Sequence, residues 1–394
     1  MMRDALLSVK ASGANRIGTL TLDSYTRTGD FETPVVCLRE GQQLNGYPIV
    51  SHSVATTQAV LVGVHDEEFP VQVRHGTPQP QTIFQRMIDV GLDATEGGPV
   101  SYCLPYGRVP LDVCVGAWAE ACHILAHRAE RPHVESFGGC LMGQLCPPSL
   151  LVAVSVLECL FFKSCGITSV SLSYAQGPSH AQDRAALRIL REAAQQLLGT
   201  IDWHVVLYTY MGLFPSTEAG ASALIASSAR LARETGTERM IVKTTAESRQ
   251  IPTLADNLHA LHLAQLAADA VDEVSNITVR EQECYEQIKE EVMALLDAVL
   301  NADGDLGRAL CSAFQHGLLD IPYCLHRDNR GLARSAIDHE GRLVWATTGN
   351  LPIRPATHCW SSDAPPSEAL LSQLAYVANR YDSSGRELPG AAAG

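Results

Sequence analysis

The regular alternation of short β-type runs with longer helical runs is the feature that most limits how this chain can fold. Between Ile17 and Ala270, runs rich in Val, Ile and Leu are each followed by a segment with helical spacing, and the connections are short. Strands that alternate with helices in this way form a parallel sheet covered by helices. The sequence therefore predicts an α/β fold.

Polar residues follow the predicted strands at seven points along the chain. These strand exits are Arg27, Arg74, Glu96 to Tyr102, Glu135, Tyr174, Tyr208 and Lys243. Seven is one fewer than the eight strands that close a TIM barrel, a fold whose active site lies at the carboxyl ends of its strands. We therefore predict a TIM-type (β/α)8 barrel that is one strand short, with these side chains on one rim.

The pattern changes after the last of these units, and two domains are expected. The barrel is predicted over residues 1–273. From Ile277 to Phe314 the spacing is helical, and Pro and Gly interrupt the chain beyond it. Residues 274–394 are therefore predicted to form a helical and irregular extension that ends in a disordered tail over Gly390 to Gly394.

The charge of the chain limits its partners. The 394 residues carry a formal net charge of −14, and no local basic patch is apparent. Nucleic-acid backbones and anionic membrane surfaces do not attract such a protein. The longest apolar run, Leu150 to Phe162, contains Glu158 and is shorter than the ~20 residues of a membrane span. Small molecules and other proteins are the expected partners.

The N-terminus and the cysteines indicate the cytoplasm. The first ten residues lack the apolar core and the small-residue cleavage site of a signal peptide. The twelve cysteines are scattered through apolar segments and include no CxxC pair. We expect buried, reduced thiols.

Two arginines and one glutamate at the strand exits are candidate ligand-binding residues. Arg27 and Arg74 suit a carboxylate or a phosphate, because a guanidinium group donates a planar pair of hydrogen bonds. Pairing with a nearby acid such as Asp23 explains them equally well. Glu96, beside Gly97, is a candidate base or ammonium acceptor, and an exposed loop carboxylate is the equal alternative.

Four further residues have two interpretations each. Tyr102 and Tyr106 are candidate donors to a ligand or caps of the core. Lys243 and Glu247, four residues apart at the last strand exit, could hold a hydroxylated ligand or form a structural ion pair.

No metal site or nucleotide loop is predicted. The spacing of His123 with His127 and of His259 with His262 suits a helix, but no third ligand accompanies either pair. The sequence contains no Walker loop, GxGxxG run or serine nucleophile elbow.

Nine short motifs, in order along the chain, resemble those of one enzyme family. They are RHGTP (74–78), EGGPVSYCLPY (96–106), ESFGG (135–139), PPS (147–149), QDRAALR (182–188), MGLFP (211–215), MIVKTTAE (240–247), IPT (251–253) and DIPY (320–323). Between about Gly13 and Pro352 the chain resembles the large catalytic (epsilon) subunit of adenosylcobalamin-dependent glutamate mutase, also called methylaspartate mutase. The resemblance implies a TIM barrel that interconverts L-glutamate and (2S,3S)-3-methylaspartate by a radical mechanism, in which the cofactor supplies the chemistry.

The resemblance also implies the roles of the substrate-binding residues. Arg27 and Arg74 would hold the substrate carboxylates. Glu96, the implied catalytic residue, would accept the substrate ammonium and ease its partial deprotonation, and Tyr102 and Tyr106 would add hydrogen bonds.

The implied cofactor is adenosylcobalamin, and it needs a second chain. Lys243 and Glu247 would contact its ribose, while a small (sigma) subunit with a DxHxxG motif would hold the cobalamin. The resemblance implies a heterotetramer that contains a dimer of large subunits. In this chain only His204 has an Asp two residues before it, and Leu207 stands where the motif needs Gly. We therefore predict that the chain alone binds no cobalamin tightly.

The chain departs from the family pattern at three places. The family has a third substrate-binding arginine in a PRxG stretch on the first barrel strand, which precedes the segment matching Met1 to Gly13. This chain shows no counterpart, so the resemblance implies a barrel that lacks its first strand, and either a longer chain exists or the barrel is open. Gln176 replaces an acid, and Tyr208-Thr209-Tyr210 replaces a His-Gln-Trp run. Two other functions therefore stay open: a degenerate barrel that serves as a binding or assembly partner, and a cobalamin-independent lyase with Glu96 as base.

Overall fold

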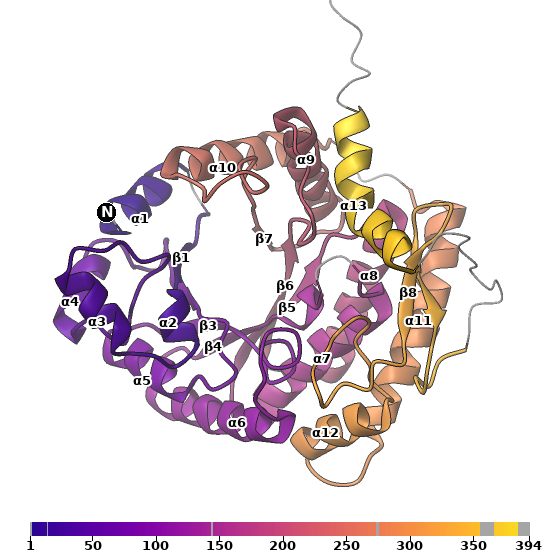
Figure 1. Ribbon diagram of the computed structural model, residues 1–394, viewed down its shortest axis with the longest axis horizontal. Coiled ribbons are helices and arrows are strands. Elements are labelled where there is room, and N and C mark those ends of the chain that lie inside the picture. The colour runs from indigo at the N-terminus through magenta and orange to yellow at the C-terminus, as the bar shows by residue number, and fades with distance from the viewer. Residues whose placement is uncertain (1, 14, 143–144, 273–275, 355–365, 385–394) are drawn as a thin grey trace, which may run out of the picture.

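A curled sheet of seven parallel strands lies at the centre of the computed structural model, which describes residues 2–13, 15–142, 145–272, 276–354 and 366–384 (Figure 1). In both chain order and spatial order the strands are β1 (Gly18–Thr21), β2 (Val71–Arg74), β3 (Ala94–Gly97), β4 (His133–Ser136), β5 (Ser169–Ala175), β6 (Asp202–Tyr208) and β7 (Arg239–Ile241). Each strand pairs in parallel with the next. The predicted α/β barrel with one strand missing is confirmed for the described residues.

Helices follow the strands and cover the outside of the sheet (Figure 1). Those that follow β2 to β7 are α5 (Gln81–Asp89), α6 (Leu111–Arg128), α7 (Pro148–Ser164), α8 (His180–Leu197), α9 (Glu218–Glu234) and α10 (Leu254–Asp269). The other helical elements of the barrel are α1 (Met2–Ala11), α2 (Ser24–Arg27), α3 (Thr33–Arg39), α4 (Val54–Leu61) and the 3-10 turn η1 (Gly138–Cys140). Each strand therefore ends in a loop at the same rim, where the candidate residues were expected.

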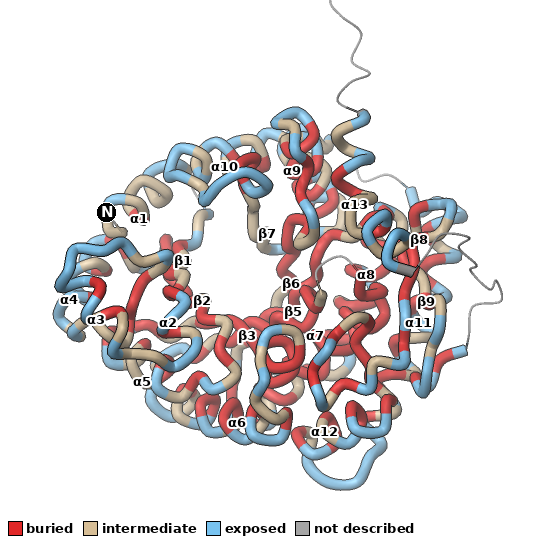
Figure 2. The backbone as a smooth tube through the Cα atoms, in the orientation of Figure 1, coloured by how far each residue is buried: buried red, intermediate tan, exposed pale blue. Residues whose placement is uncertain are grey.

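Helix α7 is the buried centre of the helical layer. It begins at Pro148, where proline needs no hydrogen-bond partner for its nitrogen. Between Leu150 and Phe162 its side chains are buried apart from the half-buried Leu160. It packs on β4 and β5 on one side and on α11 (Val279–Leu300) on the other. Figure 2 shows the same concentration of buried residues around α7 and the middle strands.

The C-terminal extension contains more regular structure than its sequence indicates. After α11 come α12 (Leu306–His316), the antiparallel pair β8 (Arg334–Ile337) and β9 (Leu343–Thr347), and α13 (Pro366–Ser384), which packs on α9. The predicted domain boundary at 273 and the predicted tail over 390–394 lie outside the described residues and stay predictions. One continuous apolar core includes residues of the barrel and of the extension, such as Val292 and Phe314.

The sheet is open between its two ends. In the described part of the chain, β1 pairs only with β2 and β7 only with β6. A cavity of about 760 Å³ lies between these edges and is lined by β1, β7 and α10. Side chains bridge it: Arg239 Nη1 donates to Gln72 Oε1 at 2.9 Å, and Arg16 Nη2 donates to Gln265 Oε1 at 2.6 Å. Backbone hydrogen bonds therefore do not close this side of the barrel in the described residues.

Two further properties concern the described part of the chain. Within the described ranges, no helix combines the length and the apolar character needed to cross a membrane. The described cysteines are unpaired, and all except the half-buried Cys311 are buried. The prediction of buried thiols is confirmed for these residues, apart from the partial exposure of Cys311.

Candidate active site

The five predicted substrate-binding residues line one cavity at the carboxyl ends of the strands. This cavity measures about 720 Å³, and its lining includes Arg27, Arg74, Glu96, Tyr102 and Tyr106. They come from α2, from β2 and β3, and from the loop after β3. The barrel thus brings together residues that are spread over eighty positions of the sequence.

The end of β3 lets Glu96 lie in the interior. Glu96 is fully buried, so the alternative of an exposed loop carboxylate is wrong. Gly97 follows with a φ of +136°, and a Cβ atom there would lie 2.5 Å from the Trp118 ring. Only glycine allows the chain to turn in this conformation so close to α6.

Arg74 and Glu96 form a bidentate ion pair. Arg74 Nε donates to Glu96 Oε1 at 2.6 Å, and Arg74 Nη2 donates to Oε2 at 2.9 Å. The Tyr102 hydroxyl donates to the same carboxylate at 2.5 Å, and the Tyr208 hydroxyl oxygen lies 2.9 Å from Glu96 Oε2. Burial raises the pKa of Glu96, but the charge of Arg74 and these hydrogen bonds outweigh it, so that the pKa lies below its ordinary value. Glu96 is therefore ionised at neutral pH.

The loop that leads to Tyr102 is bound by a buried acid that no prediction included. Glu158 Oε1 accepts from the backbone N–H groups of Val100 and Ser101 at 3.1 Å and 2.8 Å. Its Oε2 accepts from the hydroxyls of Ser101 and Ser136 at 3.1 Å and 2.7 Å. Burial raises the pKa of Glu158 to about 7. The signal for this role was its place as a lone acid inside an apolar helix.

Arg27 and Tyr106 lie toward the mouth of the cavity. Arg27 Nε donates to the carbonyl of Leu22 at 2.8 Å. The Asp23 carboxylate is engaged elsewhere, since it caps α2 by accepting from the N–H groups of Tyr25 and Thr26 and from the Thr26 hydroxyl. Tyr106 is 60% exposed, so it does not cap the core, whereas Tyr102 is buried against the core. Arg27 and Tyr106 are thus both accessible from the cavity.

Lys243 and Glu247 form an ion pair outside this cavity. Lys243 Nζ lies 2.7 Å from Glu247 Oε1 and 5.4 Å from the centre of the Phe214 ring. Both side chains are partly exposed, and neither lines the 720 Å³ cavity. The predicted ion pair is present, and contact with a ribose stays a prediction.

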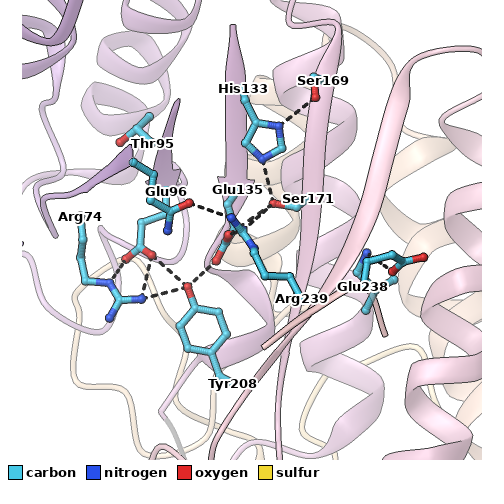
Figure 3. A network of polar contacts seen from close by, with 12 residues as sticks. Arg74, Thr95, Glu96, His133, Glu135, Ser169, Ser171, Tyr208, Glu238 and Arg239 are labelled. Carbon is cyan, nitrogen blue, oxygen red and sulfur yellow. Dashed lines mark hydrogen bonds and ion pairs between the residues drawn. The ribbon is translucent and has the colours of Figure 1, made fainter. Parts of the chain in front are cut away.

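Three residues beneath the cavity complete a network that the sequence did not reveal (Figure 3). The hydroxyl of Tyr208 on β6 contacts Glu96 at 2.9 Å and also donates to Glu135 Oε1. Glu135 on β4 is fully buried and forms an ion pair with Arg239 on β7. The sequence marked Glu135 and Tyr208 as strand exits but assigned neither to the site.

His204, the histidine compared with the DxHxxG motif, does not line the cavity. His204 lies in β6, and its ring stacks on that of His133 with 5.3 Å between the centroids. Over the described residues, no group of three or more His, Cys, Asp or Glu is arranged to hold a metal ion.

Comparison with known proteins identifies the family. The family model described as Methylaspartate mutase E chain matches residues 2–362. The chain is 30% identical to the glutamate mutase epsilon subunit of Escherichia coli O157:H7 over 383 residues, which cover 93% of this chain and 76% of that protein. It is 32% identical to the glutamate mutase epsilon subunit of Halobacterium salinarum over 391 residues, or 95% of this chain and 78% of the relative.

A relative of the same name from Desulfitobacterium hafniense is 31% identical over 349 residues, or 84% of this chain and 71% of the relative. Fold and site together define a parallel α/β barrel with an ionised acid and a paired arginine at the carboxyl ends of its strands, as in barrel enzymes. The chain belongs to the methylaspartate mutase E chain family. It is thus related to the large subunits of a mutase, which is an isomerase.

Proposed function

We propose that the chain is the large subunit of a cytoplasmic, coenzyme B12-dependent mutase that interconverts L-glutamate and (2S,3S)-3-methylaspartate by a radical mechanism. The observation that carries this proposal is the buried, bidentate pair of Arg74 and Glu96 in the cavity of a family member. An α-amino acid carries both a carboxylate and an ammonium, and each of these can replace one partner of that pair.

The charges that face the cavity suit an amino dicarboxylate. Arg74 and Arg27 provide two guanidinium groups for two carboxylates, and Glu96 provides one acceptor for one ammonium. The volume of about 720 Å³ lies within the range of small-molecule sites. Tyr106 at the mouth supplies a further hydroxyl donor. This set of groups favours L-glutamate over a neutral or a cationic amino acid.

Glu96 also has the position and charge of a base. Its lowered pKa keeps it ionised, and it would touch the ammonium that it binds. Partial transfer of one ammonium proton to Glu96 is the chemical step that this chain's own residues offer. Tyr102 holds the carboxylate while this proton moves.

The proposed cofactor is adenosylcobalamin, which when bound supplies the radical that starts the rearrangement. The exposed edges of Lys243 and Glu247 fit its ribose, because an ammonium donor and a carboxylate acceptor at 2.7 Å match neighbouring hydroxyls. We propose that a small sigma subunit with a DxHxxG motif binds the cobalamin, and that the two kinds of chain form a heterotetramer.

Reconstitution tests this function. The purified chain is mixed with a cobalamin-binding small subunit, adenosylcobalamin and L-glutamate, and 3-methylaspartate is measured. We expect product only when all four components are present. Binding of the small subunit without product would instead support the degenerate barrel, and turnover without cobalamin would support the lyase. Titration of adenosylcobalamin into the chain alone should show no tight binding.

A further inference from the structure

One nitrogen of Arg74 lies between two oxygens at the base of the site (Figure 3). Arg74 Nη2 donates to Glu96 Oε2 at 2.9 Å and to the Tyr208 hydroxyl at 3.3 Å. The two oxygens are themselves 2.9 Å apart. Both oxygens therefore already accept hydrogen bonds from the same cationic nitrogen.

The hydroxyl of Tyr208 cannot serve both of its acid neighbours. It carries one hydrogen, yet its oxygen contacts Glu96 and Glu135. Glu135 is fully buried and pairs with Arg239, so its carboxylate competes strongly for that hydrogen. When the hydrogen points to Glu135, the lone pairs of the Tyr208 oxygen face Glu96 and the guanidinium. Tyr208 then acts as an acceptor.

We propose that the Tyr208 oxygen and Glu96 Oε2 together bind the ammonium of the α-amino acid, and that Glu135, held by Arg239, keeps the Tyr208 hydrogen turned away. The inference rests on the proposed function and adds a binding residue to it. The ligand carboxylate draws the Arg74 guanidinium toward itself, and the ammonium takes the place of Nη2. One cationic nitrogen replaces another, so the buried Glu96 is never left without a counter-charge.

Two acceptors give the site a preference for amines. An ammonium carries three N–H donors and can donate to both oxygens at once. A ligand without nitrogen on its α-carbon can donate to neither. Glutarate has both carboxylates but no ammonium, so Arg74 would remain hydrogen-bonded to Glu96 and Tyr208. Tyr208 is thus a specificity residue as well as a support for Glu96.

Calorimetric titration of the full chain with L-glutamate and with glutarate tests this role. In the Tyr208→Phe variant we expect the affinity for L-glutamate to fall by about tenfold or more, because one hydrogen bond to a charged group is lost. The affinity for glutarate should change less than about twofold. The control is Tyr210→Phe, a second buried tyrosine just beyond β6 that belongs to another apolar cluster, and it should leave both affinities unchanged.

The outcomes separate this inference from the function on which it rests. Equal weakening of both ligands, or no change in either, overturns the role of Tyr208 alone. Wild-type protein that binds glutarate as tightly as L-glutamate, or binds neither with its small subunit present, overturns the proposed substrate and the inference with it. Should Tyr208→Phe not fold, Tyr208→His, whose ring can also accept, should keep part of the preference. A folded His variant without preference refutes the proposal.

Discussion

The guanidinium of Arg74 and the carboxylate of Glu96 face each other through two hydrogen bonds of 2.6 Å and 2.9 Å. Each group is the other's counter-charge while the site holds no ligand. Without this pair, a fully buried carboxylate would be costly to ionise. An amino-acid zwitterion can exchange with the pair at little electrostatic cost, because it brings one charge of each sign.

Replacement of Glu96 by Gln should abolish most turnover. The amide binds an ammonium weakly and accepts no proton, so we expect the rate to fall by about 10²-fold or more. Product formation in the reconstituted system measures this. The control Glu67→Gln changes an exposed acid that pairs with Arg131, and should keep full activity. Unchanged turnover in Glu96→Gln would remove this residue from the mechanism.

Replacement of Arg74 by Lys should weaken substrate binding. Lysine keeps the positive charge but cannot donate the planar pair of hydrogen bonds that Glu96 now receives. We expect the KM for L-glutamate to rise by about tenfold or more. Initial rates over a range of L-glutamate concentrations give this value, and Arg131→Lys on the exposed surface is the matched control. A normal KM would contradict the assignment of Arg74.

Glu158 should make the stability of the protein depend on pH. The pKa of Glu158 is about 7 in the folded chain, whereas its ordinary value of 4.5 applies to the unfolded chain. Between these two pH values only the folded chain keeps the proton. This contribution is complete below about pH 4.5 and is lost as the pH rises through 7. It amounts to about 3 kcal/mol.

Urea unfolding of wild type and of Glu158→Gln at pH 5 and pH 8 checks this, since the amide does not titrate. At each pH the free energy of unfolding of the variant is subtracted from that of the wild type. This difference should be larger at pH 5 than at pH 8 by roughly 2–3 kcal/mol. Identical pH dependence of the two proteins would show that Glu158 is not the titrating group.

Gly98 should not tolerate a side chain. A Cβ atom there would lie 2.0 Å from Glu158 Oε1, so alanine would push apart the loop that carries Tyr102. We expect Gly98→Ala to lower stability by about 2 kcal/mol or more and to reduce substrate affinity. Gly116→Ala is the control, because Gly116 lies within α6 with open space around its Cβ position and should gain about 0.5–1 kcal/mol. Thermal unfolding distinguishes the two, and equal melting points would refute the packing argument.

The sequence predicts the barrel well because periodic patterns record which face of each element is buried. The run around Val71 and the helix over 111–128 appear where they were expected. The hairpin of β8 and β9 and the helix α13 were not predicted, because they depend on contacts with distant elements: Leu343 of β9 donates to Gln182 of α8, and α13 packs on α9. Local patterns carry no information on such partners.

The same division holds for the site. Arg74 and Glu96 were found because they follow strands beside glycines and match family motifs. Tyr208 was noted only as a strand exit, since its contact with Glu96 spans 112 positions and depends on the curvature of the sheet. Glu158 was interpreted only as an interruption of an apolar run.

The opening between β1 and β7 leaves the sheet with a centre and two ends. Strands β5 and β6 align over seven residue pairs and lie in the interior of the sheet, whereas β7 aligns with β6 over three. Amide hydrogens should therefore exchange with deuterium most slowly in β4 to β6 and progressively faster toward β1 and β7. A closed barrel would protect all strands alike. Arg74 on β2 and Glu96 on β3 would then lie close to the exposed edge strand β1. Their rigidity would depend on α7 and on the polar side chains that span the gap, such as Arg239 and Gln72.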